Sequence, residues 1–263
     1  LKQDETLDDL EALLDFWRRV DAQEGFSERV LRRLFVLSYA PNGMWAYLLS
    51  TWFLARRDEG GNLDDGELYG FLRYITGFIY AYSLERPGVN ALRGPVYPAL
   101  IDIVNGRDAD FSAHLFDRET ITGRFRSYQF TNQRRFTRSM LVWWAYSDPD
   151  QPLMDLDTTL EIEHIYARKR NEVHPLADRS NLEALGNKAM LEKRVNIRAA
   201  DYQLADKCKY YEGYTNDKGA EVPGTVVREL VEIARRGDFA EANIEERTEQ
   251  IIAAFVDWLG ELG

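Results

Sequence analysis

The sequence contains a single cysteine, Cys208, among its 263 residues. One cysteine cannot form an internal disulfide, and it cannot supply the paired Cys-x-x-Cys ligands of a zinc knuckle. We therefore expect a protein of a reducing compartment, the cytoplasm.

The sequence also lacks a long apolar run. The longest, residues 44–55, is well short of the roughly 20 residues that span a bilayer, and no signal peptide precedes it. We expect no membrane insertion. The first residue is Leu1 and not Met, so we expect the chain to be a segment of a longer protein.

Positive charge is scarce, because 33 Lys and Arg stand against 44 Asp and Glu and the net charge is -11. This balance argues against a surface that binds nucleic acid everywhere, although a local basic cleft remains compatible with it. With 45% hydrophobic and 29% charged residues, the composition is that of a folded globular protein and not of a disordered one.

The first 150 residues carry apolar residues at helical spacing, interrupted by turn signals at 41–43, 60–62 and 87–88. The predicted helices begin at Thr6 and then cover 27–39, 43–57, 67–84 and 95–105. The turn-rich stretch 148–152 predicts a boundary between a helical domain, 1–150, and a second domain, 151–263. An amphipathic helix over 243–258 closes the chain.

Residues 118–138 reverse the local charge, because they hold six arginines and one acid, Glu119, interleaved with aromatic residues. Such a segment suits a surface that follows phosphates, and it equally suits a solvated helix face over buried aromatics. The candidate nucleic-acid contacts are Arg124, Arg126, Arg134, Arg135 and Arg138, with Arg194 and Arg198 further on.

Among the three histidines, His114 lies between apolar neighbours and His174 in a loop-like run, so we expect structural and surface roles for them. His164 differs, because residues 160–166 alternate like a strand and place Glu163 directly before it. A carboxylate and an imidazole at a strand end can supply a metal ligand and a general base at one point, as phosphodiester hydrolysis requires.

Three further polar residues that could belong to the same site follow His164 in the sequence. Asn187 stands in Leu185-Gly186-Asn187, where the glycine permits a tight bend between two strands, and Asn196 and Lys207 come next. Residues 199–211 predict a helix. The predicted order is therefore strand, loop, strand, helix.

This order resembles the HNH, or ββα-metal, nuclease motif, and in particular the C-terminal HNH-type domain of GmrSD-type restriction endonucleases and related phage-defence proteins. The matching residues are Ile162-Glu163-His164-Ile165, Leu185-Gly186-Asn187, Asn196 and the stretch 207–210. The closing helix, with Arg247 and Trp258, is also similar to that family. The resemblance implies a small ββα-metal module after the helical domain.

The resemblance also implies a role for each residue. His164 would be the general base, Glu163 and Asn196 would be ligands of one Mg²⁺ or Mn²⁺ ion, and Asn196 would lie on a strand. Asn187 would fix the loop and orient His164. Lys207 would either contact phosphate or anchor its helix through a salt bridge. Oxygen ligands of this kind suit a hard cation better than zinc.

Two departures from the family pattern stand out. Ala167 replaces the usual proline, which puts the shape of the loop in doubt more than the chemistry. Lys188-Ala189-Met190 replaces the usual Leu-Thr-Leu. The family's N-terminal nucleotide-binding domain, with its Asp-Gly-Gln-Gln-Arg signature, is absent from the sequence.

We therefore expect a metal-dependent DNA endonuclease of a restriction or phage-defence protein, with DNA and an upstream nucleotide-binding domain as partners. The alternative is a catalytically silent nucleic-acid-binding or scaffold module that regulates such an upstream domain. The sequence does not distinguish DNA from RNA, nicking from double-strand cutting, or a monomer from an oligomer.

Overall fold

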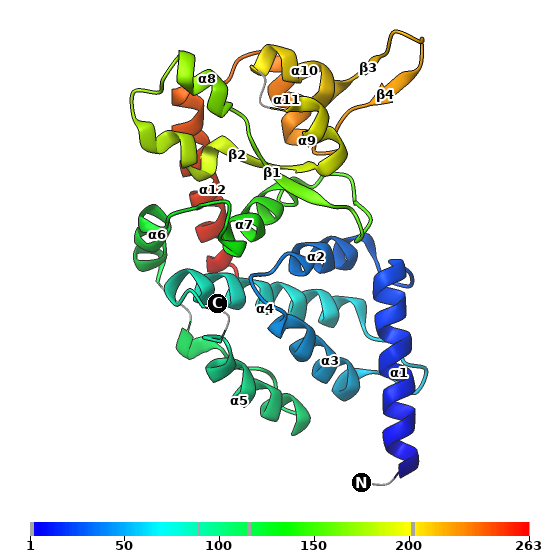
Figure 1. Cartoon of the computed structure of the whole chain (residues 1–263). Helices are drawn as coiled ribbons and strands as arrows, with labels where there is room; N and C mark the ends of the chain where they lie inside the picture. Colours follow the sequence, from blue (N-terminus) through cyan, green and yellow to red (C-terminus); the bar gives the residue numbers. More distant parts are fainter. Residues whose placement is uncertain (1–2, 89, 115–116, 201–202, 263) are drawn as a thin grey trace. The chain divides into compact units, whose positions relative to one another are not determined.

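The computed structural model describes residues 3–88, 90–114, 117–200 and 203–262 of the chain. It is mainly helical and contains two small antiparallel sheets, so the predicted mainly α class is confirmed (Figure 1). No helix in these ranges is both long enough and apolar enough to span a bilayer.

The chain divides into two compact units. Unit 1 comprises residues 1–126 and 258–263, and unit 2 comprises residues 127–257. This division lies before α7, and the domain boundary predicted at 148–152 stays a prediction. Each unit is described by itself.

In the described residues of unit 1, all regular elements are helices. Their bounds are α1 Gln3–Ala22, α2 Glu28–Ser38, α3 Met44–Arg56, α4 Asp65–Glu85, α5 Arg93–Val104 and α6 Arg118–Ser127, with a short 3-10 turn at Ser112–His114. The second to fifth of these begin and end within two residues of the predicted bounds. The helices end near the predicted breaks because the glycine and proline residues there disfavour a helix interior.

Helix α4 is the centre of unit 1. The side chain of Asp64 accepts a hydrogen bond from the Glu67 amide (2.9 Å) and so caps its first turn. Most residues of α4 from Leu68 onward are buried, and α2 and α3 pack against it. Stacked rings join these helices, for example Trp52 with Phe71 at 4.8 Å between centroids.

The apolar stripe of α1 is only partly buried. Phe16 and Val20 lie in the core, whereas Leu7, Leu10 and Leu14 are exposed. The amphipathic spacing therefore predicted the helix, and burial of the stripe is confined to its C-terminal half.

Unit 2 surrounds a two-stranded antiparallel sheet. Its elements are α7 Arg135–Ala145, β1 Leu160–His164, α8 Arg168–Val173, β2 Lys188–Glu192, α9 Lys193–Ala199, α10 Leu204–Glu212, β3 Gly213–Thr215, β4 Glu221–Pro223, α11 Arg228–Arg236 and α12 Glu241–Gly260. Strands β3 and β4 form a separate hairpin. Helix α10 covers the predicted helix over 199–211 only from Leu204 onward, because Ala199 ends α9. Residues 201 and 202 of the predicted helix lie outside the described ranges.

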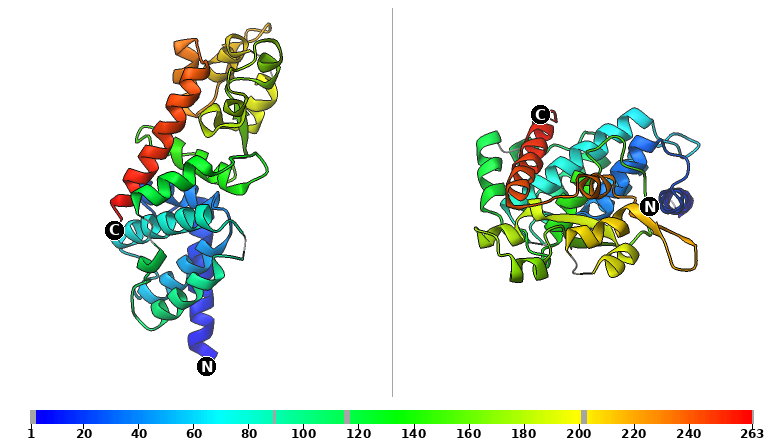
Figure 2. Two further views of the ribbon diagram at one scale, coloured as in Figure 1. Left: turned by 90° about the vertical axis from the view of Figure 1, so that its left-hand side faces the viewer. Right: turned by 90° about the horizontal axis from the view of Figure 1, so that it is seen from above.

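Helix α7 belongs to unit 2 because it packs against β2 and α12. The rings of Trp143 and Phe255 meet at 4.8 Å, and α7 and α12 lie side by side in two views (Figures 1 and 2). The Trp144 indole donates a hydrogen bond to Glu229 on α11 (2.9 Å). These contacts bind residues before 148 to residues after it.

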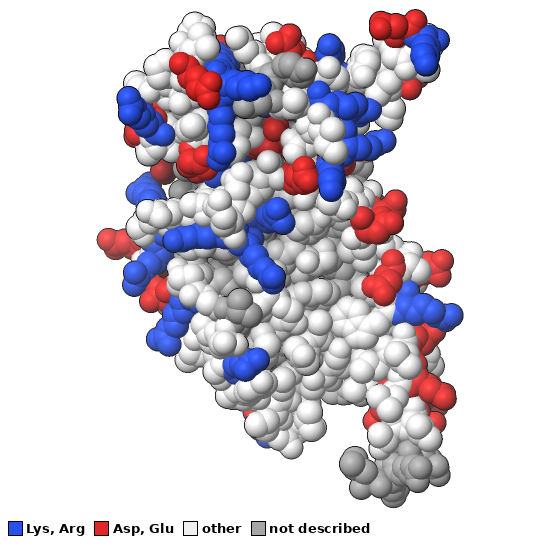
Figure 3. Space-filling view, in the orientation of Figure 1, with Lys and Arg blue, Asp and Glu red and all other residues white. Residues whose placement is uncertain are grey.

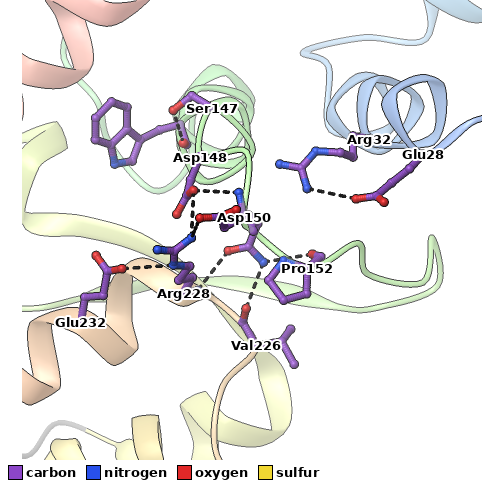
Figure 4. Close-up of polar contacts among 11 residues, drawn as sticks. Glu28, Arg32, Ser147, Asp148, Asp150, Pro152, Val226, Arg228 and Glu232 are labelled. Carbon is purple, nitrogen blue, oxygen red and sulfur yellow. Dashed lines mark hydrogen bonds and ion pairs between the residues drawn. The ribbon is translucent and has the colours of Figure 1, made fainter.

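The turn at 148–152 is itself anchored inside unit 2. Figure 4 shows the Arg228 guanidinium between the carboxylates of Asp148 (3.3 Å), Asp150 (2.5 Å) and Glu232 (3.1 Å). Gln151 donates to the Val226 carbonyl (2.9 Å). The turn-rich composition predicted a domain boundary here, and in the structure Arg228 anchors this turn within unit 2.

Candidate functional site

The candidate site is built on the β1–β2 pair. Antiparallel pairing places His164 opposite Lys188 and Glu163 opposite Ala189. Successive side chains of a strand point to opposite faces. Glu161 and Glu163 therefore lie on one face of β1, which we call the acid face, and His164 lies on the other, which we call the base face.

On the acid face, Glu163 is buried, at 5% exposed, and is held by α10. Its Oε1 accepts hydrogen bonds from the Lys207 ammonium (2.5 Å) and from the Tyr211 hydroxyl (2.7 Å). Lys207 is 1% exposed and also donates to the His164 carbonyl (2.9 Å). Of its two expected roles, Lys207 therefore has the geometry of the helix anchor, with its ammonium away from the surface.

Burial raises the pKa of Tyr211 well above its ordinary value, and the negative charge of Glu163 adds to this effect. The phenol thus remains a hydrogen-bond donor to Glu163. The consequence is a carboxylate whose position is fixed from one side by two buried donors.

The acid face also holds Glu161 and Asn196. The Asn196 amide nitrogen donates to Oε2 of Glu161 (2.8 Å). Asn196 lies on α9, directly after β2, and not on a strand as expected. Glu161 was not singled out from the sequence, although its place two residues before Glu163 put it on the same face.

On the base face, the His164 ring lies beside Glu183. Nε2 of His164 is buried and forms no hydrogen bond with a described residue. It lies 3.5 Å from Oε1 of Glu183. Glu183 in turn binds Arg168 (2.8 Å) and Lys188 (2.7 Å).

The pKa values on this face are shifted together. Burial lowers the pKa of His164 to about 4, assisted by the charges of Lys188 and Arg168 and opposed by Glu183. Burial alone would raise the pKa of Glu183, but the hydrogen bond and charge of Lys188 outweigh it and hold the pKa at about 2. At neutral pH the imidazole is therefore neutral and able to accept a proton, beside an ionised carboxylate.

The structure separates the two halves of the expected site. Glu163 contacts α10, Asn196 contacts Glu161, and His164 faces Glu183, so the described hydrogen bonds do not join the three side chains at one point. The Lys207 ammonium bridges the two residues of the motif, because it donates to the Glu163 carboxylate and to the His164 carbonyl.

Asn187 is fully buried and fastens the loop that leaves β1. Its Oδ1 accepts from the Tyr166 amide (2.7 Å), and its Nδ2 donates to the carbonyls of Tyr166 (3.2 Å) and Leu182 (2.9 Å). Its own carbonyl accepts from the Ile165 amide (2.9 Å). These bonds hold the residues that immediately follow His164.

The Leu185–Asn187 segment is a 3-10 turn, and the strand begins only at Lys188. A Cβ on Gly186 would lie 2.0 Å from the Ile244 carbonyl oxygen of α12. The glycine is therefore required by a close approach of α12, and not by the bend between strands that the sequence predicted.

Arg247 on α12 holds this turn in place through hydrogen bonds. Its Nη1 donates to the carbonyls of Gly186 (2.8 Å) and Lys188 (2.7 Å), while its Nε is bound to Glu229 (2.6 Å). The family resemblance marked Arg247 in the closing helix, but its role becomes visible only in the fold.

The arginine-rich segment forms solvated helix faces over buried rings. The guanidinium groups lie on exposed residues, whereas Phe125, Phe130 and Phe136 are buried. Arg124 is paired with Glu85 (2.7 Å) and Arg134 lies over the Tyr128 ring (4.8 Å). The exposed arginines of this set are Arg118, Arg124, Arg126, Arg134, Arg135 and Arg138. Both interpretations require exposed arginines over buried rings, so the nucleic-acid contacts stay a prediction.

The two later candidate arginines lie on α9. Arg194 is exposed and lines a cavity of about 630 Å³ together with Lys193, Ile197 and Glu192. Arg198 donates to the Pro223 carbonyl (3.0 Å). On the face drawn in Figure 3, basic and acidic side chains are interspersed over unit 2.

Within the described ranges, no group of three or more His, Cys, Asp or Glu side chains is arranged to hold a metal ion. Comparison of the chain with known protein families found no match, and neither did comparison with curated proteins or with solved structures.

Proposed function

We propose that unit 2 is a metal-dependent endonuclease that hydrolyses phosphodiester bonds in DNA, with His164 as the general base. The observation that carries this proposal is the position of a neutral, half-buried imidazole at the end of β1, next to two carboxylates on the opposite face. Two antiparallel strands followed by helices, with α8 and two 3-10 turns between the strands, support the resemblance to HNH-type nucleases. A restriction or phage-defence role, with an upstream nucleotide-hydrolysing domain, is the biological setting that this resemblance implies.

The chemistry of the acid face fits a hard cation in part. Oε2 of Glu163, Oε1 of Glu161 and Oδ1 of Asn196 accept no hydrogen bond from a described residue, and oxygen donors of these types suit Mg²⁺ or Mn²⁺. Lys207 already offsets one charge at Glu163, so few protein charges remain for the ion. We assign Glu163 and Asn196 to the metal, with Glu161 beside them.

Bound there, a divalent ion would neutralise charge on the phosphate and on the leaving oxygen. The residues of the chain account for the rest of the reaction. His164 takes a proton from a water molecule, and the resulting hydroxide attacks phosphorus as the bond from phosphorus to O3′ breaks. The departing O3′ takes a proton from a second water molecule, which leaves a 5′-phosphate and a 3′-hydroxyl. Asn187 keeps the loop after His164 in place throughout.

A nicking assay tests this proposal. Supercoiled plasmid is incubated with the full chain and Mg²⁺ or Mn²⁺, with and without a chelator, and His164→Ala is compared with the matched control His174→Ala, which changes an exposed loop histidine. We expect metal-dependent nicking that falls roughly 10²- to 10⁴-fold in His164→Ala and is unchanged in His174→Ala. Equal nicking by both variants, or no nicking by folded protein, would contradict it. Single-stranded RNA in a parallel reaction identifies a ribonuclease.

One observation favours the second candidate, a catalytically silent scaffold that regulates an upstream domain. The Lys207 ammonium lies where a cation is needed beside Glu163. Calorimetric titration with Mn²⁺ separates the two candidates: a scaffold binds no ion at this face, whereas the nuclease binds one and loses it in Glu163→Ala.

A further inference from the structure

Glu183 stands at the centre of a charged cluster that neither the motif nor the resemblance assigned. It lies at the end of a short 3-10 turn, Arg179–Glu183, ahead of the Leu185–Asn187 turn. One of its oxygens, Oε2, accepts from the Lys188 ammonium at 2.7 Å. The other, Oε1, accepts from Arg168 at 2.8 Å and lies 3.5 Å from Nε2 of His164.

Lys188 fixes this carboxylate from inside the protein. The lysine side chain is 0% exposed, and its ammonium also donates to the Phe130 carbonyl (2.5 Å). A buried ammonium requires a negative partner, because an unpaired buried charge is strongly unfavourable. Lys188 lies directly opposite His164 in the strand pair, so the lysine that departs from the family pattern brings Glu183 to the histidine.

The two ring nitrogens of His164 have different surroundings. Nε2 is buried and faces the Glu183 carboxylate. Nδ1 makes no hydrogen bond to a described residue and is not among the buried unpartnered atoms, so it reaches solvent. At 3.5 Å the two atoms do not form a hydrogen bond, but an ionised carboxylate can only accept one, so its negative charge favours the tautomer with the proton on the neighbouring Nε2.

We propose that Glu183 is a positioning residue that holds the His164 ring with a protonated Nε2 turned inward and the lone pair of Nδ1 turned to solvent. This inference rests on the proposed function, because it assigns the base to one atom of His164. Nδ1 takes the proton of the attacking water, and the imidazolium that forms is stabilised by the Glu183 carboxylate on its other side. A carboxylate that orients a catalytic histidine in this way acts without exchanging a proton itself.

The competing interpretation is that Glu183 only neutralises Lys188 and Arg168. The two interpretations differ in the tautomer of His164, which the ¹⁵N shifts of the histidine ring report in the full chain at neutral pH. With three histidines in the sequence, His114→Gln and His174→Gln assign the His164 signals. The variants are Glu183→Gln and the double variant Glu183→Ala with Lys188→Met, which leaves no unpaired ammonium. Glu172→Gln, an exposed acid on α8, is the matched control.

We expect wild type to carry the proton on Nε2, Glu183→Gln to keep that tautomer in part, and the double variant to lose the preference. In the nicking assay kcat should fall roughly 10- to 100-fold in the double variant with little change in KM, and Glu172→Gln should match wild type. Circular dichroism verifies that each variant is folded. If the double variant unfolds, a partial loss of the Nε2 tautomer in Glu183→Gln supports the inference, and a tautomer equal to that of wild type overturns it.

A wild-type ring protonated on Nδ1, or a tautomer unaffected by loss of Glu183, overturns this inference. Its failure differs from failure of the proposed function. Wild type that nicks DNA but has a Glu183-independent tautomer refutes the positioning role alone. Wild type that shows the Glu183-dependent tautomer and never nicks refutes the nuclease, while the ring orientation stands.

Discussion

On one face of β1 a carboxylate is held by a lysine and a tyrosine that are both buried, whereas on the other face an imidazole lies beside a carboxylate that is 42% exposed. The acid face is closed by α10, since Lys207 and Tyr211 are nearly inaccessible. The base face opens to solvent at Nδ1 of His164 and at Glu183.

The difference teaches which half of the site can change protonation with the solvent and in which half a buried ion pair fixes the position of Glu163. A buried ion pair is expensive to break and holds geometry. A partly exposed imidazole with a nearby carboxylate can exchange protons with water. We therefore expect variants of the acid face to lose stability, and solution conditions to act mainly through the base face.

The largest effect is expected from Lys207→Met. Removing the ammonium leaves the Glu163 carboxylate buried without its ionic partner, which costs about 3–5 kcal/mol of unfolding free energy. Chemical denaturation measures it, with the exposed Lys209→Met as matched control, expected within about 0.5 kcal/mol of wild type. Adding Glu163→Gln to Lys207→Met should restore much of the loss. A loss below about 1 kcal/mol in the single variant would show that the acid face is not the closed half.

The base face should make the free energy of unfolding decrease at acidic pH. His164 has a pKa of about 4 in the folded chain and 6.5 as its ordinary value, so between these pH values the unfolded chain binds a proton that the folded chain does not. The free energy of unfolding is therefore highest above pH 6.5. It falls by on the order of 2–3 kcal/mol as the pH decreases toward 4, because His164 takes up a proton in the unfolded chain first. Glu183 acts in the same direction between its ordinary 4.5 and about 2.

Denaturation in metal-free buffer at pH 7 to 4 measures this loss. His164→Gln should flatten the profile in that range, and His174→Gln should leave it as in wild type. Equal pH profiles in wild type and His164→Gln would remove the proposed difference between the two faces.

Asn187→Ala tests the loop that joins the faces. The substitution leaves the Tyr166 amide and two carbonyls without partners in a fully buried site, at a cost of about 1–3 kcal/mol. Asn171→Ala, which removes one hydrogen bond to the Leu176 amide at a less buried site, is the matched control and should cost less. A larger effect in Asn171→Ala would place the fastening of this loop elsewhere.

Periodicity predicted the helices of unit 1 and the strand that carries His164, because each depends on a local spacing of apolar residues: every three or four residues in a helix and every second residue in a strand. It could not predict that Asn196 lies on a helix or that the Leu185–Asn187 turn is held by α12. Those features depend on Arg247 and Gly186 meeting across 61 residues of sequence. Local composition at 148–152 predicted a domain boundary, and it could not show that Arg228 anchors this turn.

The role of Glu183 was not predicted either, because it also depends on contacts between residues that are distant in the sequence. It belongs to no motif, and only the pairing of His164 with Lys188 brings it to the imidazole. One signal was present: a lysine stands in a stretch that is otherwise apolar up to Leu191, and a charge on a buried strand requires a partner. The sequence thus indicated that a carboxylate was needed without identifying which one.

The smallest effect is expected from Ala167→Pro, which restores the proline of the family pattern at the exit from β1. Ala167 has φ −64° and ψ 147°, the conformation that proline prefers, and its amide makes no hydrogen bond to a described residue. Proline should therefore stabilise the chain by about 0.4–1 kcal/mol by restricting the unfolded state. The matched control is Ala177→Pro, which removes the amide hydrogen bond to Glu241 (2.8 Å) and should destabilise. Thermal denaturation of both variants measures the effects. Destabilisation by Ala167→Pro would mean that Tyr166 cannot adopt the extended conformation required before a proline. In that case the alanine would be needed to keep the loop between the two faces in its observed shape.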